Sequence, residues 1–496
     1  MRARADSGSL ATPSVVKIVF VTPELAPVSK VGGLADIAAS LPRALKRLGH
    51  RVYVIVPRYA TGTGVESVGP VATGIELELE MDGARRTARL SRARLSGVTT
   101  YFVESDDYFE GRAIYGESGR DYDDNPFRFA FFSRAALAAT EALGLAPDII
   151  HVNDWQTSLL PVYQRLEDRA SRMPVVLTVH NLAYQGIFPR ELLPRLGLPD
   201  ALFHIDGLEF YGRLNFLKGG LVSAERLTTV SPSYAQEIQR SELGAGLEGV
   251  LRARADRLTG IVNGIEPNDW DPGKDPALTS RFASTRLSGK AAGKIELQKE
   301  LGLTLSPRTP LLAAIGRLDP QKGLELVLEA VPALVAEERA QLVVLGSGRE
   351  EFLDAFRPLV ARYPKAISVN RGFQEALGRR IYAGADLFLM PSRYEPCGLG
   401  QMIALRYGTL PVVRATGGLA DTIRDLDEDP DRGNGFSFEA FDASALLATL
   451  RRALRHYENE KLWTRWVRRA MREDSSWKSS AGRYLDVYEQ AIHDLD

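Results

Sequence analysis

The chain has 496 residues, 45% hydrophobic and 25% charged, which is the composition of a globular protein with two or three domains. The formal net charge of −1 gives no reason to expect a nucleic acid or an anionic membrane as a partner. The single cysteine, Cys397, excludes an internal disulfide framework and favours a reducing, cytoplasmic compartment.

The N-terminal half begins with a pattern typical of a strand–helix–strand unit. Residues 1–14 lack the apolar core of a signal peptide and predict a disordered tail. The β-branched run 15–21 predicts a buried strand, residues 34–49 have helical spacing, and 51–57 predict a second strand. No apolar run approaches the roughly 18 residues of a membrane span.

Further apolar runs predict two successive sheets with helices between their strands. The first continues at 100–103, 148–152, 175–179 and 227–230, and the second comprises 311–315, 341–345, 367–369, 386–390 and 411–413. Alternation of this kind predicts α/β domains with mostly parallel sheets. We expect an N-terminal domain over 15–262 and a C-terminal domain over 263–476. A helix over 477–496 should pack back on the first domain. The segment 264–308 predicts only a short helical stretch.

The pentapeptide GGLAD occurs twice, at 32–36 and at 417–421, each time after a predicted strand and before a predicted helix. Backbone N–H groups at such turns, together with the helix dipole, favour anions. Two doubly wound domains could therefore offer both loops to one shared cleft, although either copy alone is also explained as a simple turn. The first turn lacks the G-x-G-x-x-G fingerprint, which argues against a nicotinamide dehydrogenase.

Three cations lie at such turns, namely Lys30, Arg317 and Lys322. Lys30 precedes the first glycine pair, and the other two flank the turn of GRLDPQKG after a strand predicted to end at Ile315. Together they could neutralise a nucleotide diphosphate without a metal, although each could instead lie on a solvated surface loop.

Polar side chains follow other predicted strands. Asp154 and His180 come directly after two of them, Asn263 lies at the presumed hinge, and Glu395 follows a third strand. A carboxylate at Glu395 could accept sugar hydroxyls, and the N–H groups of the next residues could meet phosphate. A structural role for His180 is an equal alternative. Cys397 is a poor candidate nucleophile, because no histidine is near it in sequence.

Eight segments give the chain a family resemblance: KVGGLAD, HVNDWQT, VHNLAYQG, VSPSYAQEI, VNGIEPNDWDP, GRLDPQKG, EPCGLGQ and TGGLADT. In this order, over nearly the whole chain, they resemble bacterial glycogen synthases and plant starch synthases. The resemblance implies a GT-B fold, with two Rossmann-like domains around a deep cleft. It also implies transfer of glucose from ADP-glucose to the non-reducing end of an α-1,4-glucan, with retention at the anomeric carbon. No cofactor, metal, nucleic acid or membrane is expected, and the oligomeric state is left open.

The same resemblance assigns roles by position. Lys30 resembles the lysine at the donor phosphate, Arg317 and Lys322 resemble the diphosphate pair, and Glu395 resembles a residue around the transferred glucose. The resemblance also implies that His180 and Asn263 lie around the glucose and that Asp154 and Tyr115 lie on the sugar or acceptor side. Phe373 would stack on adenine. The donor loops would include Gly33, Cys397, Gly398 and Leu399.

The mechanism implied by these residues is mainly electrostatic. Related GT-B enzymes often carry a second glutamate eight residues after the first, where this chain has Ile403. A covalent double displacement is therefore poorly supported. Departure of the diphosphate from an oxocarbenium-like centre, with the acceptor entering on the same face of a closing cleft, is favoured.

Three alternatives to this activity are a non-catalytic glucan-binding paralogue, a metal-dependent transferase and a GT-B enzyme with another donor or acceptor. The first should have lost the cations, which are present here. The second would use the acids of DLDED at 425–429, interpreted here as a solvated loop. UDP-glucose is the strongest competing donor.

Overall fold

The computed structural model describes residues 15–59, 64–117, 119–166, 172–337, 339–372 and 374–495, so the predicted tail 1–14 lies outside the described residues. The chain divides into two compact units. The first comprises Met1–Thr178, Tyr184–Leu227 and Tyr484–Asp496, and the second comprises Val179–Ala183 and Thr228–Arg483.

The first sheet has nine strands in the order β14-β13-β9-β8-β1-β2-β5-β4-β3. Neighbouring strands among β9, β8, β1, β2 and β5 pair in parallel. Every residue of β8 and β9 is buried, which explains their continuous apolar sequences. The bounds are β1 (Lys17–Val21), β2 (Arg51–Pro57), β3 (Val71–Met81), β4 (Ala84–Leu95), β5 (Val98–Glu104), β8 (Ile149–Asn153), β9 (Val175–Val179), β13 (Arg226–Thr229) and β14 (Leu258–Gly260).

The antiparallel hairpin of β3 and β4 was not predicted from the sequence. β4 also pairs antiparallel with β5, so this edge of the sheet is antiparallel, in contrast to the parallel strands from β9 to β5. In β3, exposed Glu76, Glu78 and Glu80 alternate with half-buried aliphatic residues. An edge strand covered on one face needs no long apolar run, and its signal is therefore weak.

Most of the first sheet lies in the first unit, whereas β14 and the ends of β9 and β13 belong to the second. Helices and short strands complete the first unit. In α1 the residues that face the sheet are buried, among them Leu34, Ile37, Leu41 and Leu45. Its helices are α1 (Gly33–Arg47), α2 (Asn125–Ala142), α3 (Leu159–Leu166) and α4 (Phe216–Ser223), and its short strands are β6 (Gly116–Glu117), β7 (Arg120–Asp121), β10 (Ile187–Pro189), β11 (Glu209–Phe210) and β12 (Arg213–Asn215).

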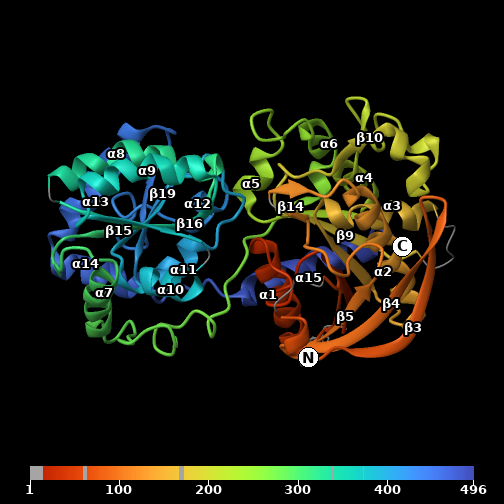
Figure 1. The fold of residues 1–496 in the computed structure, drawn as a ribbon, viewed down its shortest axis with the longest axis horizontal. Coiled ribbons are helices and arrows are strands. Elements are labelled where there is room, and N and C mark those ends of the chain that lie inside the picture. Colours follow the sequence, from red (N-terminus) through yellow and green to blue (C-terminus); the bar gives the residue numbers. More distant parts are fainter. Residues whose placement is uncertain are drawn as a thin grey trace, which may run out of the picture. The chain divides into compact units, whose positions relative to one another are not determined.

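The second sheet has six strands, all paired in parallel, in the order β17-β16-β15-β18-β19-β20. Helices α8 and α9 lie on one face of this sheet and α10 and α11 on the other (Figure 1). The strands are β15 (Leu311–Leu318), β16 (Gln341–Gly348), β17 (Ile367–Arg371), β18 (Leu387–Met390), β19 (Leu410–Arg414) and β20 (Phe436–Phe438). This is the second predicted doubly wound sheet.

The helices of the second unit include one that is longer than the sequence predicted. Helix α7 (Ser288–Glu300) spans 13 residues of the segment expected to have only a short helical stretch. Its Lys290 and Lys294 are buried, which masks the apolar face that periodicity would detect. The others are α5 (Pro232–Glu237), α6 (Glu248–Ala253), α8 (Leu324–Ala336), α9 (Glu350–Arg362), α10 (Glu375–Gly384), α11 (Gly400–Arg406), α12 (Gly417–Thr422), α13 (Ala443–Tyr457) and α14 (Glu460–Ala470).

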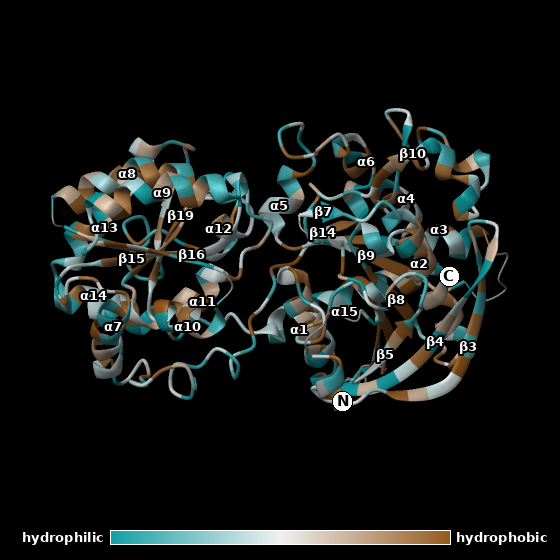
Figure 2. Ribbon diagram, viewed as in Figure 1, coloured by the Kyte–Doolittle hydropathy of each residue, from teal (hydrophilic) through white to brown (hydrophobic). Residues whose placement is uncertain are grey.

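The final helix α15 (Trp477–His493) contributes its residues from Tyr484 onward to the first unit. Its Tyr488 hydroxyl lies 2.7 Å from Nδ1 of His151, a fully buried residue of β8, whose Nε2 lies 2.6 Å from the Thr178 hydroxyl. Strands β5, β8 and β9 are mainly hydrophobic, whereas β3, β4 and most helices carry both kinds of residue (Figure 2). Among the residues placed by the structure, none forms a helix long and apolar enough to cross a membrane.

Candidate functional site

The first GGLAD loop is organised by a buried carboxylate. Oε2 of Glu24 accepts hydrogen bonds from the N–H groups of Val31 at 2.7 Å and Gly32 at 2.9 Å. Helix α1 then begins at Gly33. A Cβ added at Gly32 or Gly33 would meet no atom within 4 Å. The two glycines therefore leave the surface beside the helix start open, as a ligand that approaches the backbone requires.

Lys30 is held beside this helix by the aspartate of the same pentapeptide. Its Nζ lies 2.7 Å from Oδ1 of Asp36, and the two side chains are 35% and 40% exposed. An ion pair this exposed contributes little to stability because water and salt screen it. A phosphate can therefore compete with Asp36 for the ammonium at small cost.

Tyr115 lies against the same carboxylate. Its hydroxyl donates to Oε1 of Glu24 at 2.6 Å. Burial and the Glu24 carboxylate raise the pKa of Tyr115 well above its ordinary value, with a smaller contribution from Asp154. The loop before it is held by the fully buried guanidinium of Arg128, which donates to the carbonyls of residues 113 and 114 at 2.9 Å each. Tyr115 therefore presents a protonated hydroxyl from a well-fixed loop.

Asp154 follows β8 with an unusual backbone conformation, φ 56° and ψ −175°. Its N–H donates to the carbonyl of Thr178 at 2.9 Å, and its own carbonyl accepts from the Ser158 hydroxyl at 2.8 Å. A positive φ at a residue with a side chain costs on the order of 1 kcal/mol or more, and such strain clusters at functional sites. Glu24 thus joins Tyr115 to the backbone of Val31 and Gly32, which lie between Lys30 and Gly33 in the chain. Asp154 contributes to the electrostatic environment of Tyr115.

In the second unit the structure brings Lys322 and Glu395 together. The Lys322 Nζ lies 2.6 Å from Oε2 of Glu395, which also accepts from the Ser392 hydroxyl at 3.1 Å. Glu395 is only 5% exposed. Lys322 stands at the turn that leads into α8, where Gly323 adopts φ 64° and where a Cβ would overlap with the carbonyl of Pro391. This tight approach of the two loops sets the cation beside the carboxylate.

Arg317 lies within β15, because this strand runs to Leu318 rather than ending at Ile315 as predicted. Its Nη2 donates to Oε1 of Gln321 at 3.1 Å, and Nε2 of Gln321 donates to the carbonyl of Tyr394 at 3.2 Å. Gln321 therefore links Arg317 to the loop that carries Glu395. Arg317 and Lys322 thus lie with Glu395 at the carboxyl ends of β15 and β18, the two central strands of the second sheet.

Asn263 and Cys397 contact each other in the second unit. Burial raises the pKa of the Cys397 thiol to about 12, partly opposed by hydrogen bonds from Asn263. The thiol is thus un-ionised at neutral pH, as expected for a residue with no nucleophilic role. Gly398 has φ 74° and Leu399 precedes α11, so the loop turns sharply here before the helix begins.

The second GGLAD differs from the first. The N–H of Gly417 donates to Oε1 of Glu237 at 2.8 Å, and the N–H of Gly418 donates to the carbonyl of Glu395 at 3.0 Å. A Cβ at Gly417 would overlap with the Glu395 carbonyl, and one at Gly418 with that of Cys397. The expectation that this copy offers these N–H groups to a ligand is wrong, because the protein itself uses them. Its glycines permit two loops to pack closely.

His180 follows β9 as predicted, and burial lowers its pKa to about 3. The imidazole is therefore neutral at physiological pH, which excludes a permanent cation at this position. It can offer one ring N–H and accept at the other nitrogen.

Phe373 lies outside the described residues. The interpretation of 425–429 as a solvated loop is wrong for Asp425, which is buried and paired with Arg452 at 2.6 Å. Asp427 contacts the same guanidinium at 2.8 Å and His456 at 2.6 Å. These two acids have internal cations as partners, which weakens the metal-dependent alternative.

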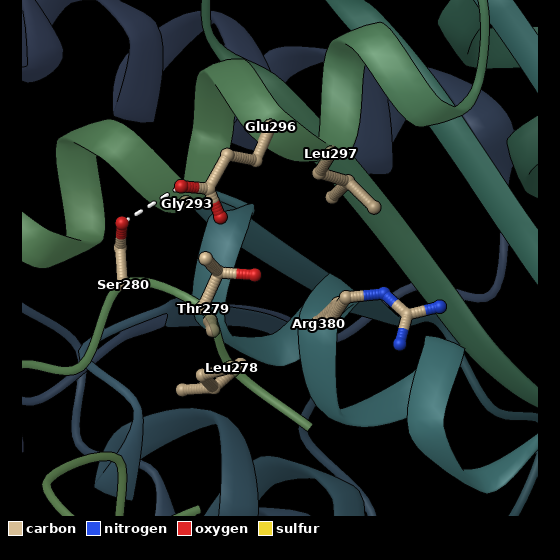
Figure 3. Close-up of a pocket in the computed structure, with 8 residues that line it drawn as sticks. Leu278, Thr279, Ser280, Gly293, Glu296, Leu297 and Arg380 are labelled. Carbon is tan, nitrogen blue, oxygen red and sulfur yellow. Dashed lines mark hydrogen bonds between the residues drawn. The ribbon is translucent and has the colours of Figure 1, made fainter. Parts of the chain in front are cut away.

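A shallow hollow in the second unit is unrelated to these residues. It holds about 250 Å³ of empty space, partly open to solvent, between α7, α10 and the segment before α7 (Figure 3). Ser280 donates to Glu296 across it at 2.7 Å. No predicted site residue lines it.

Sequence reasoning missed the residues that support the site, chiefly Glu24, Arg128, Gln321, Ser392 and Glu237. Glu24 stands within the first strand-to-helix loop, and Glu237 lies in the VSPSYAQEI segment. The only feature of the sequence that could have indicated these two residues is that each is a carboxylate in or beside a segment with other candidate site residues. Nothing in their spacing shows which backbone N–H groups they reach.

Two family models match consecutive parts of the chain. Residues 17–253 match the starch synthase catalytic domain, and residues 302–472 match glycosyl transferases group 1. A solved sucrose-phosphate synthase from Thermosynechococcus elongatus, 17% identical with a TM-score of 0.59, shares the fold. Two Rossmann-like α/β units with these matches define a GT-B glycosyltransferase.

Relatives with higher sequence identity show the family to which the chain belongs. Glycogen synthase of Syntrophotalea carbinolica is 47% identical, with 96% of this chain and 99% of the relative covered. That of Anaeromyxobacter sp. (strain Fw109-5) is 48% identical, with 95% and 99% covered. The catalytic domain of starch synthase IV from Arabidopsis thaliana, bound to ADP and acarbose, is 36% identical with a TM-score of 0.90, over 97% of this chain and 100% of that one. The chain belongs to the glycogen and starch synthase family.

Proposed function

We propose that this protein transfers glucose from ADP-glucose to the non-reducing end of an α-1,4-glucan, such as glycogen, with retention at the anomeric carbon. The observation that carries the proposal is the Lys322–Glu395 pair, 2.6 Å apart and linked through Gln321 to Arg317. The starch synthase IV structure contains ADP and acarbose, which supports a nucleotide sugar and a glucan as substrates.

In this proposal Arg317 and Lys322 bind the diphosphate and stabilise the charge that develops on it as the glycosidic bond breaks. Preorganised charges of this kind often supply the largest part of a rate enhancement. Lys30, whose ion pair with Asp36 is exposed, adds a third cation on the phosphate side. Three cations can match a diphosphate, so we propose that no metal is required.

Glu395 and the residues near it serve the sugar in this scheme. The buried carboxylate accepts glucose hydroxyls, while neutral His180 can hydrogen-bond the transferred sugar. Position 403 holds Ile403, a buried residue of α11, so it provides no second carboxylate. We therefore favour departure of the diphosphate and entry of the acceptor on the same face over a covalent intermediate.

On the first unit, Tyr115 and Asp154 are proposed to contact the acceptor glucan. Tyr115 offers an aromatic ring and a hydroxyl oxygen that can accept a hydrogen bond, since its proton is donated to Glu24, and the strained backbone of Asp154 fits a functional position. The single cysteine is compatible with action in the cytoplasm.

The test is a transfer assay with purified protein, glycogen and either ADP-glucose or UDP-glucose in parallel. We expect new α-1,4 linkages and a kcat/KM at least tenfold higher with ADP-glucose. Higher kcat/KM with UDP-glucose would establish the alternative donor. Absence of transfer from both would refute the proposed activity.

A further inference from the structure

Helix α5 makes polar contacts with two loops of the second unit that carry proposed site residues. The Ser231 hydroxyl, at the start of the helix, donates to the carbonyl of Pro396 at 2.7 Å. The Tyr234 hydroxyl accepts the N–H of Leu182 at 3.1 Å, two residues after His180. One short helix is therefore bonded both to the Glu395 loop and to the segment of His180.

Helices α5 and α12 also cap each other. The N–H of Ser233 donates to Oδ2 of Asp421 at 2.8 Å, and its hydroxyl donates to Oδ1 at 2.7 Å. In the opposite direction Oε1 of Glu237 accepts the N–H of Gly417 at 2.8 Å and the hydroxyl of Thr416 at 3.0 Å. The first turn of a helix has N–H groups without intrahelical partners and a positive dipole end, so each carboxylate stabilises the other helix.

The capped turn of α12 is bonded to the backbone of Glu395. The N–H of Gly418 donates to the Glu395 carbonyl at 3.0 Å, and Gly417 packs so closely on this carbonyl that no Cβ fits between them. The Glu395 side chain is buried as well, and buried side chains are closely packed. We therefore expect a displacement of α12 to displace the Glu395 side chain. Glu237 is two bonded steps away from the carboxylate that faces Lys322.

We propose that Glu237 is a positioning residue for the transfer reaction, a proposal that rests on the function assigned above to Glu395. Glu237 holds the first turn of α12, this turn holds the backbone of Glu395, and the Glu395 carboxylate is thereby kept beside Lys322. Glu237 itself contacts neither donor nor acceptor. The second GGLAD is thus part of the support of the site rather than an anion-binding loop.

The first experiment compares Glu237→Ala, Glu237→Gln and the control Gln236→Ala in the transfer assay. Gln236 is an exposed residue of the same helix. Glutamine keeps a side-chain oxygen that accepts from Gly417 and Thr416, whereas alanine removes it. We expect kcat to fall about tenfold in Glu237→Ala with KM for ADP-glucose within twofold of wild type, since small misplacements of a catalytic group have large effects on rate. Glu237→Gln should retain at least half of the wild-type kcat, and Gln236→Ala all of it.

The second experiment measures hydrogen–deuterium exchange of peptides spanning residues 391–401, which needs no turnover. Glu237→Ala should exchange faster here, while Glu237→Gln and Gln236→Ala should match wild type. If wild type transferred no glucose, the proposed function would fail while this measurement still decided the coupling.

Three results would overturn the proposal. The first is unchanged exchange over 391–401 in Glu237→Ala, and the second is faster exchange with wild-type kcat. The third is a loss of kcat that glutamine does not restore and that follows a loss of Tm, because this would show general destabilisation.

Discussion

The ammonium of Lys322 and the carboxylate of Glu395 form an ion pair of 2.6 Å in which the lysine side chain is 23% exposed and the glutamate side chain 6%. A carboxylate this buried depends on its cation more than a surface group does. Lys322 is therefore both a partner of Glu395 and, in the proposed reaction, a ligand of the diphosphate.

Replacing either cation of the diphosphate pair should reduce turnover. We expect kcat to fall on the order of 100-fold in both Lys322→Ala and Arg317→Ala, the effect typical of removing one preorganised charge contact. Because Arg317 is exposed, its variant should keep the wild-type Tm, whereas Lys322→Ala should lose some stability. Arg339→Ala, which removes an exposed ion pair with Glu458 in the same unit, is the control. Near wild-type turnover in both variants would disprove the diphosphate assignment.

The reaction should proceed without a divalent metal. After exhaustive EDTA treatment and dialysis, we expect at least 80% of the initial rate, because in the proposed reaction cationic side chains bind the diphosphate, and because Asp425 and Asp427 are paired with Arg452. Activity that disappeared and returned with Mg²⁺ or Mn²⁺ would contradict this expectation.

His180 should make stability depend on pH in the acid range. Its pKa is lowered to about 3 in the folded protein, below the ordinary value of 6.5, so between these values the unfolded chain binds more protons. The contribution of His180 to the free energy of unfolding should therefore be fully present above pH 6.5. Below pH 6.5 the free energy of unfolding should fall by up to about 1.4 kcal/mol per pH unit. Denaturation of wild type and His180→Gln at pH 7.5 and 5.5 measures this, with exposed His204→Gln as control. An equal pH dependence in wild type and His180→Gln would contradict the prediction.

The two copies of GGLAD should respond differently to the same substitution. Gly33→Ala adds a methyl group to open space, so we expect an unchanged Tm. In the proposed reaction this methyl group obstructs the donor, and kcat/KM should therefore be at least tenfold lower. Gly417→Ala forces a side chain into φ 46° against the Glu395 carbonyl and should destabilise by about 2 kcal/mol or more. Thermal denaturation and the transfer assay on both variants give the comparison. Equal loss of Tm in the two would show that the glycines are equivalent.

The parallel strands could be predicted because burial on both faces demands apolar residues throughout. β8 and β9 have this property, and the predicted runs lie within one or two residues of the observed bounds. The hairpin of β3 and β4 lacks it, since its solvent-facing residues are Glu and Arg. Arg317 was misplaced for a related reason, because β15 continues past its apolar residues into Gly316 and Arg317.

The site could be predicted only as far as residue type and strand ends indicate it. Lys322 and Glu395 each follow a strand of one sheet, and the structure places them in contact. The support by Glu24 and Glu237 could not be predicted, because a hydrogen bond from a carboxylate to a distant backbone N–H leaves no periodic trace. The same is true of the close packing of Gly417 on Glu395, which depends on the path of two loops.

The contribution of α15 to the first unit has a consequence for synthesis of the chain. Residues 484–496 belong to the same compact unit as β1 and β8, yet they are made some 300 residues after β9. At roughly 5–20 residues per second a ribosome needs about 15 to 60 s for that distance. During this interval His151 in the middle of the first sheet lacks Tyr488, its partner at 2.7 Å, and apolar surface that α15 covers is exposed. The N-terminal unit can therefore complete this part of its core only after the second unit has been made.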